Sequence, residues 1–120
     1  MAVIFAASSI PDMTSLPGNV SDKTGHFTGY AILGALVVWA LAGARAAGLS
    51  AGAGLRALAI SVAYGASDET HQRFVHGRSP ALDDWLADSL GAATAIVLVM
   101  VVGNLWRRRR LSAIERAVRS

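Results

Sequence analysis

The polar and ionisable side chains of this sequence gather in three groups, each at one end of a long apolar stretch. The first group opens with a lysine and continues with a histidine and a tyrosine spaced by one helical turn. The second is an Asp-Glu pair followed by a glutamine, and the third is two aspartates spaced i, i+4. We expect the three groups to converge into one polar site, made of Lys23, His26, Tyr30, Asp68, Glu69, Gln72, Arg78, Asp84 and Asp88.

The first function open to these residues is binding of an anion. Lys23, Arg73 and Arg78 would hold a phosphate or carboxylate, while the acids and histidines would take hydroxyls or amides. The plainest alternative is structural, because a buried network of ion pairs and hydrogen bonds can fix the register of packed helices. In that case the chain would serve as a non-catalytic accessory subunit of a larger membrane complex.

Catalysis, as a membrane-embedded hydrolase or transferase, is a further alternative, and no residue is assigned a catalytic role. His26, His71 and the acidic pair 68–69 would act as acid, base or nucleophile in phosphoryl or acyl transfer if burial shifts their pKa values. The sequence has no Gly-rich phosphate loop, serine elbow or dinucleotide fingerprint. It also has no His-x-x-x-His or Glu-x-x-His spacing that would place two metal ligands on one helix. We therefore favour binding over catalysis and expect no metal and no cofactor.

The elements that must position these groups are membrane-spanning helices. Thr24–Ala44 is 21 residues without a formal charge and Ser89–Trp106 is 18, whereas a bilayer core needs about 20 apolar residues. A third span, from Leu55 to about Gln72, requires Arg56 to snorkel to the interface. Residues 1–10 resemble the end of a further span. The sequence thus predicts an all-α membrane protein, a bundle of three full transmembrane helices plus a short or truncated N-terminal first helix.

Composition and charge agree with this fold class. The 120 residues are 53% hydrophobic and only 16% charged, which excludes disorder and a coiled coil, and the absence of cysteine excludes disulfides. Eight of the eleven basic residues lie in the 45–56 connection or after the last apolar stretch, with Glu115 as the only acid there. That side carries a net charge of +7 and the other side −4, which places the connection and the C-terminus in the cytoplasm. The overall charge of +3 therefore reflects how basic residues are distributed between the two sides of the membrane. For this reason no nucleic-acid partner is expected.

A run of four arginines directly follows the last apolar stretch. We divide the chain there, into a transmembrane domain over residues 1–106 and a basic cytoplasmic tail over 107–120, whose last ten residues are expected to form a short interfacial helix. Basic residues at this position bind anionic lipid headgroups. Those expected to do so are Arg107, Arg108, Arg109 and Arg110.

Taken in order, the polar groups resemble the VanZ-like family of small bacterial integral membrane proteins, which is named for a teicoplanin-resistance protein. The resemblance runs from Ser8 to about Gly91 and implies a multi-pass protein of the bacterial cytoplasmic (inner) membrane that acts near the cell envelope. It also implies a ligand such as a lipid-linked precursor or a glycopeptide-related compound. Apart from the resemblance, the partners we expect are membrane lipids, and other membrane-protein subunits or a second copy of the chain. The matching pieces are Asp22-Lys23-x-x-His26-Phe27-x-x-Tyr30, Tyr64-Gly65-x-x-Asp68-Glu69-x-x-Gln72, Gly77-Arg78-Ser79-Pro80 and Asp84-x-x-x-Asp88-x-x-Gly91.

One departure from the family pattern concerns charge. The last polar position is often asparagine in the family and is Asp88 here. An additional acid at this depth indicates a nearby cation or a protonated carboxyl.

Overall fold

Three helices make up the part of the chain that the computed structural model describes, which is residues 22–43, 49–75 and 82–119. They are α2 (Asp22–Leu41), α3 (Ala51–Gln72) and α4 (Leu82–Arg119), and these described residues contain no strand. The all-α prediction is therefore confirmed. The expected first helix over residues 1–10 lies outside the described residues.

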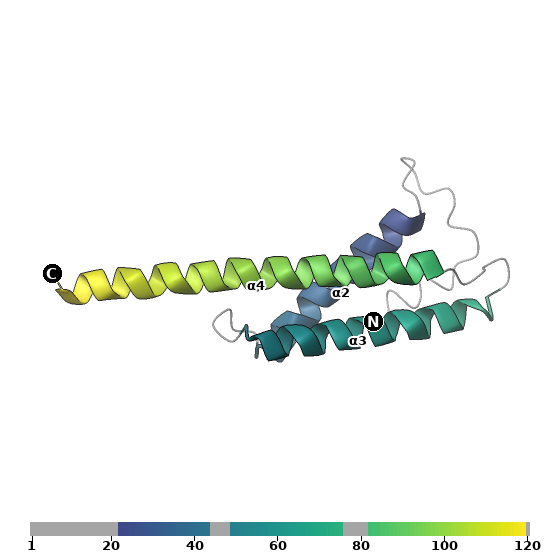
Figure 1. The fold of residues 1–120 in the computed structure, drawn as a ribbon, viewed down its shortest axis with the longest axis horizontal. Helices are drawn as coiled ribbons and strands as arrows, with labels where there is room; N and C mark the ends of the chain where they lie inside the picture. Colours follow the sequence, from purple (N-terminus) through teal and green to yellow (C-terminus); the bar gives the residue numbers. More distant parts are fainter. Residues whose placement is uncertain (1–21, 44–48, 76–81, 120) are drawn as a thin grey trace.

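The helices are arranged so that their polar ends meet. In Figure 1, α3 and α4 run side by side in opposite directions and α2 crosses them obliquely, packing most extensively on α4. The start of α2, the end of α3 and the start of α4 consequently lie toward one end of the molecule (Figure 1). This end carries all three polar groups predicted to converge.

Two of the helices, α2 over Lys23–Leu41 and α4, are long and apolar enough to cross a membrane. Helix α3 has the length to do so but contains Arg56 and the acids at 68–69, so it does not pass the same test of length and composition. Three full spans therefore stay a prediction. Large apolar side chains lie on the outer surface of the apolar segments. Leu36, for example, is 57% exposed and Leu98 is 58% exposed.

The ends of the helices follow from local sequence. Gly43 adopts a left-handed φ of 66°, which only glycine takes without strain, and it stops α2 after Leu41. The hydroxyl of Ser50 caps α3 by accepting a hydrogen bond from the backbone N–H of Ala53 at 3.2 Å. The connection between α2 and α3 thus carries both a stop and a start signal.

Close contact between α2 and α4 depends on two small residues. A Cβ atom built on Gly34 would lie 2.8 Å from the carbonyl oxygen of Ala92, and one on Gly91 would clash with the carbonyl oxygen of Phe27. The two backbones therefore touch directly, as small residues permit in membrane helix pairs. This crossing fixes the register of α2 against α4, and with it the positions of the polar groups that each helix carries.

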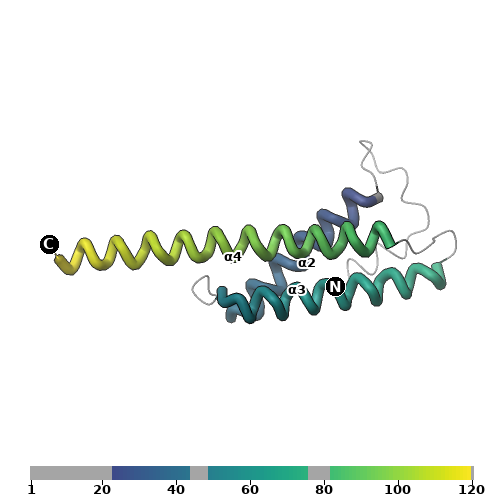
Figure 2. The backbone as a smooth tube through the Cα atoms, in the orientation of Figure 1, coloured from purple at the N-terminus to yellow at the C-terminus, as the bar shows by residue number. Residues whose placement is uncertain are grey.

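Helix α4 differs most from expectation. We expected a span ending at Trp106 and a separate tail helix, whereas α4 continues without interruption over 38 residues to Arg119. The arginine run is part of this helix, and Figure 2 shows its end projecting far beyond α2 and α3. The division expected at 106/107 thus falls inside one continuous helix.

Candidate functional site

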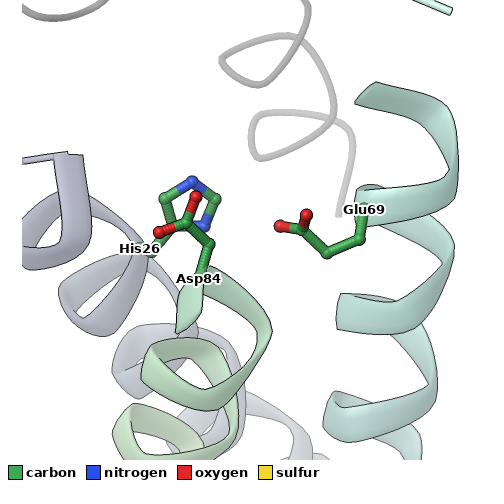
Figure 3. A group of neighbouring side chains, drawn as sticks. All are labelled: His26, Glu69 and Asp84. Atoms are coloured by element: carbon green, nitrogen blue, oxygen red, sulfur yellow. The ribbon is translucent and has the colours of Figure 1, made fainter. Parts of the chain in front are cut away.

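The centre of the polar end is a group of three side chains from three helices. His26 comes from α2, Glu69 from α3 and Asp84 from α4, and one potential ligand atom of each lies within 4.8 Å of the other two. Figure 3 shows the Glu69 carboxylate pointing across the gap between the helices toward the other two side chains. Glu69 and Asp84 are buried, with 9% and 8% of their surface exposed.

Asp88 lies one helical turn after Asp84 and anchors the histidine. Its Oδ1 is 2.9 Å from Nδ1 of His26, and the Asp88 side chain is completely buried. With Asp88 ionised, the Nδ1–H of His26 donates to this oxygen, so that the neutral ring keeps its lone pair on Nε2. The contact joins α2 to α4 and holds the imidazole in one orientation.

The floor of the site is closely packed around Gly65 of α3. A Cβ atom there would lie 3.3 Å from Oδ2 of Asp88 and 3.4 Å from the ring of Tyr30. Nearby, the indole N–H of Trp85 donates to the carbonyl oxygen of Val62 at 3.2 Å and ties α4 to α3. The absence of a side chain at Gly65 therefore allows the carboxylate of Asp88 to approach α3.

The other predicted residues divide between the interior, the rim and the part of the chain outside the described residues. Asp68 and Gln72 are buried on α3 beside Glu69, with 2% and 1% of their surface exposed. Lys23 lies at the rim, where its Nζ is 2.9 Å from Oδ2 of Asp83 and both side chains are largely exposed. Arg73 is exposed just after the end of α3, and Arg78 lies outside the described residues.

One grouping made by helical spacing differs from the structure. Spacing assigns Glu69 and Arg73 to a common face of the third helix, adjoining that of Asp68 and Gln72. In the structure Glu69 is buried with Asp68 and Gln72, whereas Arg73 follows the last helical residue and points into solvent. Arg73 is the C-cap residue of α3 and keeps helical backbone angles, with φ −59° and ψ −25°, although its side chain is exposed.

The comparison with protein families decides the relationship of the chain. The sequence model of the VanZ/LLP1 family matches residues 3–103. The chain belongs to the VanZ/LLP1 family. The resemblance drawn from the polar groups is thus confirmed, and comparisons with curated proteins and with solved structures gave no significant match. VanZ/LLP1 membership, together with the two apolar helices, indicates a membrane protein.

The VanZ/LLP1 match includes every residue of the polar site and stops before the arginine run. The arginines at 107–110 are exposed on α4, and the guanidinium of Arg110 lies over the ring of Trp106 at 6.0 Å. The carboxy-terminal turns of α4 are therefore an extension beyond the matched region.

The charge of this VanZ/LLP1 site is strongly unbalanced. Four of its carboxyl groups are buried, whereas no lysine or arginine is buried in residues 22–43, 49–75 and 82–119. Buried charges in proteins are paired or bound to metals, because an isolated ion loses its hydration. The four acids are Asp68, Glu69, Asp84 and Asp88.

The grouping of His26, Glu69 and Asp84 is the feature that sequence reasoning missed. Our expectation of no metal site rested on ligand spacing within one helix, and ligands from three helices leave no such spacing. The available signal was weaker: each of the three residues stands within the first or last turns of its helix, on the polar end. Only the packing of all three helices on one another brings them into one place.

Proposed function

We propose that this VanZ/LLP1 protein is a multi-pass protein of the bacterial cytoplasmic membrane whose outward-facing polar site binds an anionic component of the cell envelope, such as a lipid-linked precursor. The observation that carries the proposal is the position of the buried polar cluster along α4. The cluster stands at the opposite end of the apolar segment from the arginine run.

The length of α4 sets the depth of the site. Arg107 follows Asp88 by 19 residues, which is about 28 Å along a helix at 1.5 Å per residue. The hydrocarbon core of a bilayer is about 30 Å thick. With the arginines held at the headgroups of one leaflet, Asp84 and Asp88 reach the headgroup level of the other leaflet. Lipid headgroups are therefore the ligands that this position can meet.

The same arrangement supports three spans and a cytoplasmic C-terminus. Helix α3 runs beside α4 over 22 residues, so its two ends lie near the two surfaces that α4 connects. Arg56 then falls near the arginine-rich side, and Asp68 and Glu69 near the other. The basic side faces the cytoplasm because positive residues are retained there during insertion.

The side chains suit a polar headgroup in two ways. Lys23 stands exposed at the rim, where an anionic group can compete with Asp83 for its ammonium group. Deeper in the site, Gln72 and Tyr30 are buried, and their Nε2 and Oη atoms lack hydrogen-bond partners within the described residues. Buried polar atoms of this kind are suited to hydroxyls or amides of a ligand.

The proposal is tested by teicoplanin susceptibility of cells that produce the wild-type chain or a variant. Glu69→Gln and Asp84→Asn remove one buried charge each, and Glu115→Gln removes an exposed acid far along α4 as the matched control. We expect protection by the wild type and the control and none by the two site variants at equal membrane abundance.

Two results would contradict the proposal. If all four chains protect equally, the polar site plays no part in the effect. If the two site variants fail to accumulate in the membrane while the control does, the polar network is structural, and the chain is better described as an accessory subunit to be identified by copurification.

A further inference from the structure

We infer that the group of His26, Glu69 and Asp84 is a binding site for one divalent transition-metal ion of the Zn²⁺ type. One nitrogen and two carboxylate oxygens, each from a different helix, already lie within 4.8 Å of one another. In a tetrahedral site with metal–ligand distances near 2.1 Å, neighbouring ligand atoms stand about 3.3 Å apart. The closure needed is below roughly 1.5 Å. Glu69 supplies it most easily, because its carboxylate ends a flexible side chain that already points toward the others (Figure 3).

The second, independent observation is Asp88. Its fully buried carboxylate contacts Nδ1 of His26 through Oδ1 at 2.9 Å, which leaves Nε2 of the neutral ring as the nitrogen able to bind a metal. A carboxylate that receives the other N–H of a ligating histidine is the usual second partner in zinc sites. The Oδ2 atom of Asp88 is also buried and has no hydrogen-bond partner among the residues described.

Charge and ligand type decide the class of ion. Glu69 and Asp84 together carry the two negative charges that a divalent ion neutralises, in a site with no buried lysine or arginine among the described residues. An imidazole ligand favours zinc and its neighbours over Mg²⁺ and Ca²⁺, which prefer oxygen ligands alone.

Three protein ligands leave a coordination position open. A phosphate or carboxylate oxygen of the ligand can occupy that position, where the positive charge of the ion would attract it. This role for the ion rests on the proposed function. Binding of the ion itself does not, because it can be measured in the absence of any anionic lipid.

The test uses the full chain in nanodiscs of neutral phosphatidylcholine, stripped of metal by a chelator and titrated with Zn²⁺ in competition with a chromophoric chelator. We expect one equivalent per chain, more than about 100-fold weaker binding by Glu69→Gln or Asp84→Asn, and about 10-fold weaker binding by Asp88→Asn. Asp83→Asn, next to Asp84 but exposed, is the matched control and should bind as the wild type does. Circular dichroism of each sample establishes that the helices are intact.

A spectroscopic readout keeps the test decisive even if a site variant unfolds. Co²⁺ added to the wild type should give visible d–d bands typical of four or five nitrogen and oxygen ligands. Absence of a stoichiometric Zn²⁺ site in the wild type, or loss of binding in Asp83→Asn rather than in Asp84→Asn, would overturn the inference. Failure of teicoplanin protection with Zn²⁺ binding intact would count against the proposed function only.

Discussion

Replacing Gly34 by alanine tests the helix crossing on which the polar site depends. The added methyl group would lie 2.8 Å from the carbonyl oxygen and 2.9 Å from the Cα atom of Ala92, against 3.4 Å or more in an ordinary contact. Because both atoms belong to the backbone, no rotamer change relieves the overlap, and the helices must separate by roughly half an ångström. Overpacking of this kind costs about 1–3 kcal/mol.

The matched control is Gly29→Ala, five residues earlier on the same helix, where the added methyl group meets nothing within 4 Å. Both variants gain the same helix propensity, about 1 kcal/mol for alanine over glycine. The difference between their midpoints of thermal unfolding therefore isolates the packing. At about 4 °C per kcal/mol, Gly34→Ala should unfold roughly 4–12 °C below Gly29→Ala.

The assay is thermal unfolding of the detergent-purified chains, followed by tryptophan fluorescence and by loss of the monodisperse peak in size-exclusion chromatography. Equal midpoints for the two variants would show that α2 and α4 do not touch at Gly34, and the geometry of the site would lose its basis. The same separation should lengthen the contact between His26 and Asp88, since both flank the crossing. Weaker Zn²⁺ binding by Gly34→Ala than by Gly29→Ala is therefore expected as well.

Three further predictions concern other parts of the fold. Ser50→Ala removes the hydroxyl that caps α3 and should lower the free energy of unfolding by about 1 kcal/mol, measured by thermal unfolding; an unchanged midpoint would contradict the cap. Trp85→Phe removes the hydrogen bond to Val62 and should cost about 0.5–1.5 kcal/mol, whereas the exposed Trp106→Phe should cost less in the same assay. Ser112→Cys adds the only cysteine, and a membrane-impermeant maleimide should label it in inverted vesicles but not in intact cells; labelling of intact cells would place the C-terminus outside.

Features of the fold that leave a pattern in the sequence were predicted, and features that leave no such pattern were not. Long charge-free stretches located α2 and the apolar half of α4 because helix length in a membrane is set by the thickness of the bilayer. The continuation of α4 through the arginines was not foreseen, since a hydropathy boundary marks the end of an apolar segment and not the end of a helix. Arginine and alanine are good helix formers, so nothing local stops the helix before Arg119.

The site was predictable as a set of residues but not as an arrangement. Spacing placed Asp84 and Asp88 on one face of a helix, and both are buried there. The contact of Asp88 with His26 joins residues 62 positions apart, and it depends on a helix crossing that only Gly34 and Gly91 permit. Glycines leave little periodic signal in a sequence, because their contribution is the absence of a side chain, which lets two backbones come into contact.

The continuity of α4 has a consequence for how the protein responds to its surroundings. Because α4 has no break between Asp84 and Arg110, the depth of the carboxylates in the bilayer is coupled to the depth of the arginines. A bilayer with longer acyl chains would draw the carboxylates below the headgroups, and one with shorter chains would lift them into water. In the proposed orientation, acyl-chain length would therefore set the hydration of the polar site.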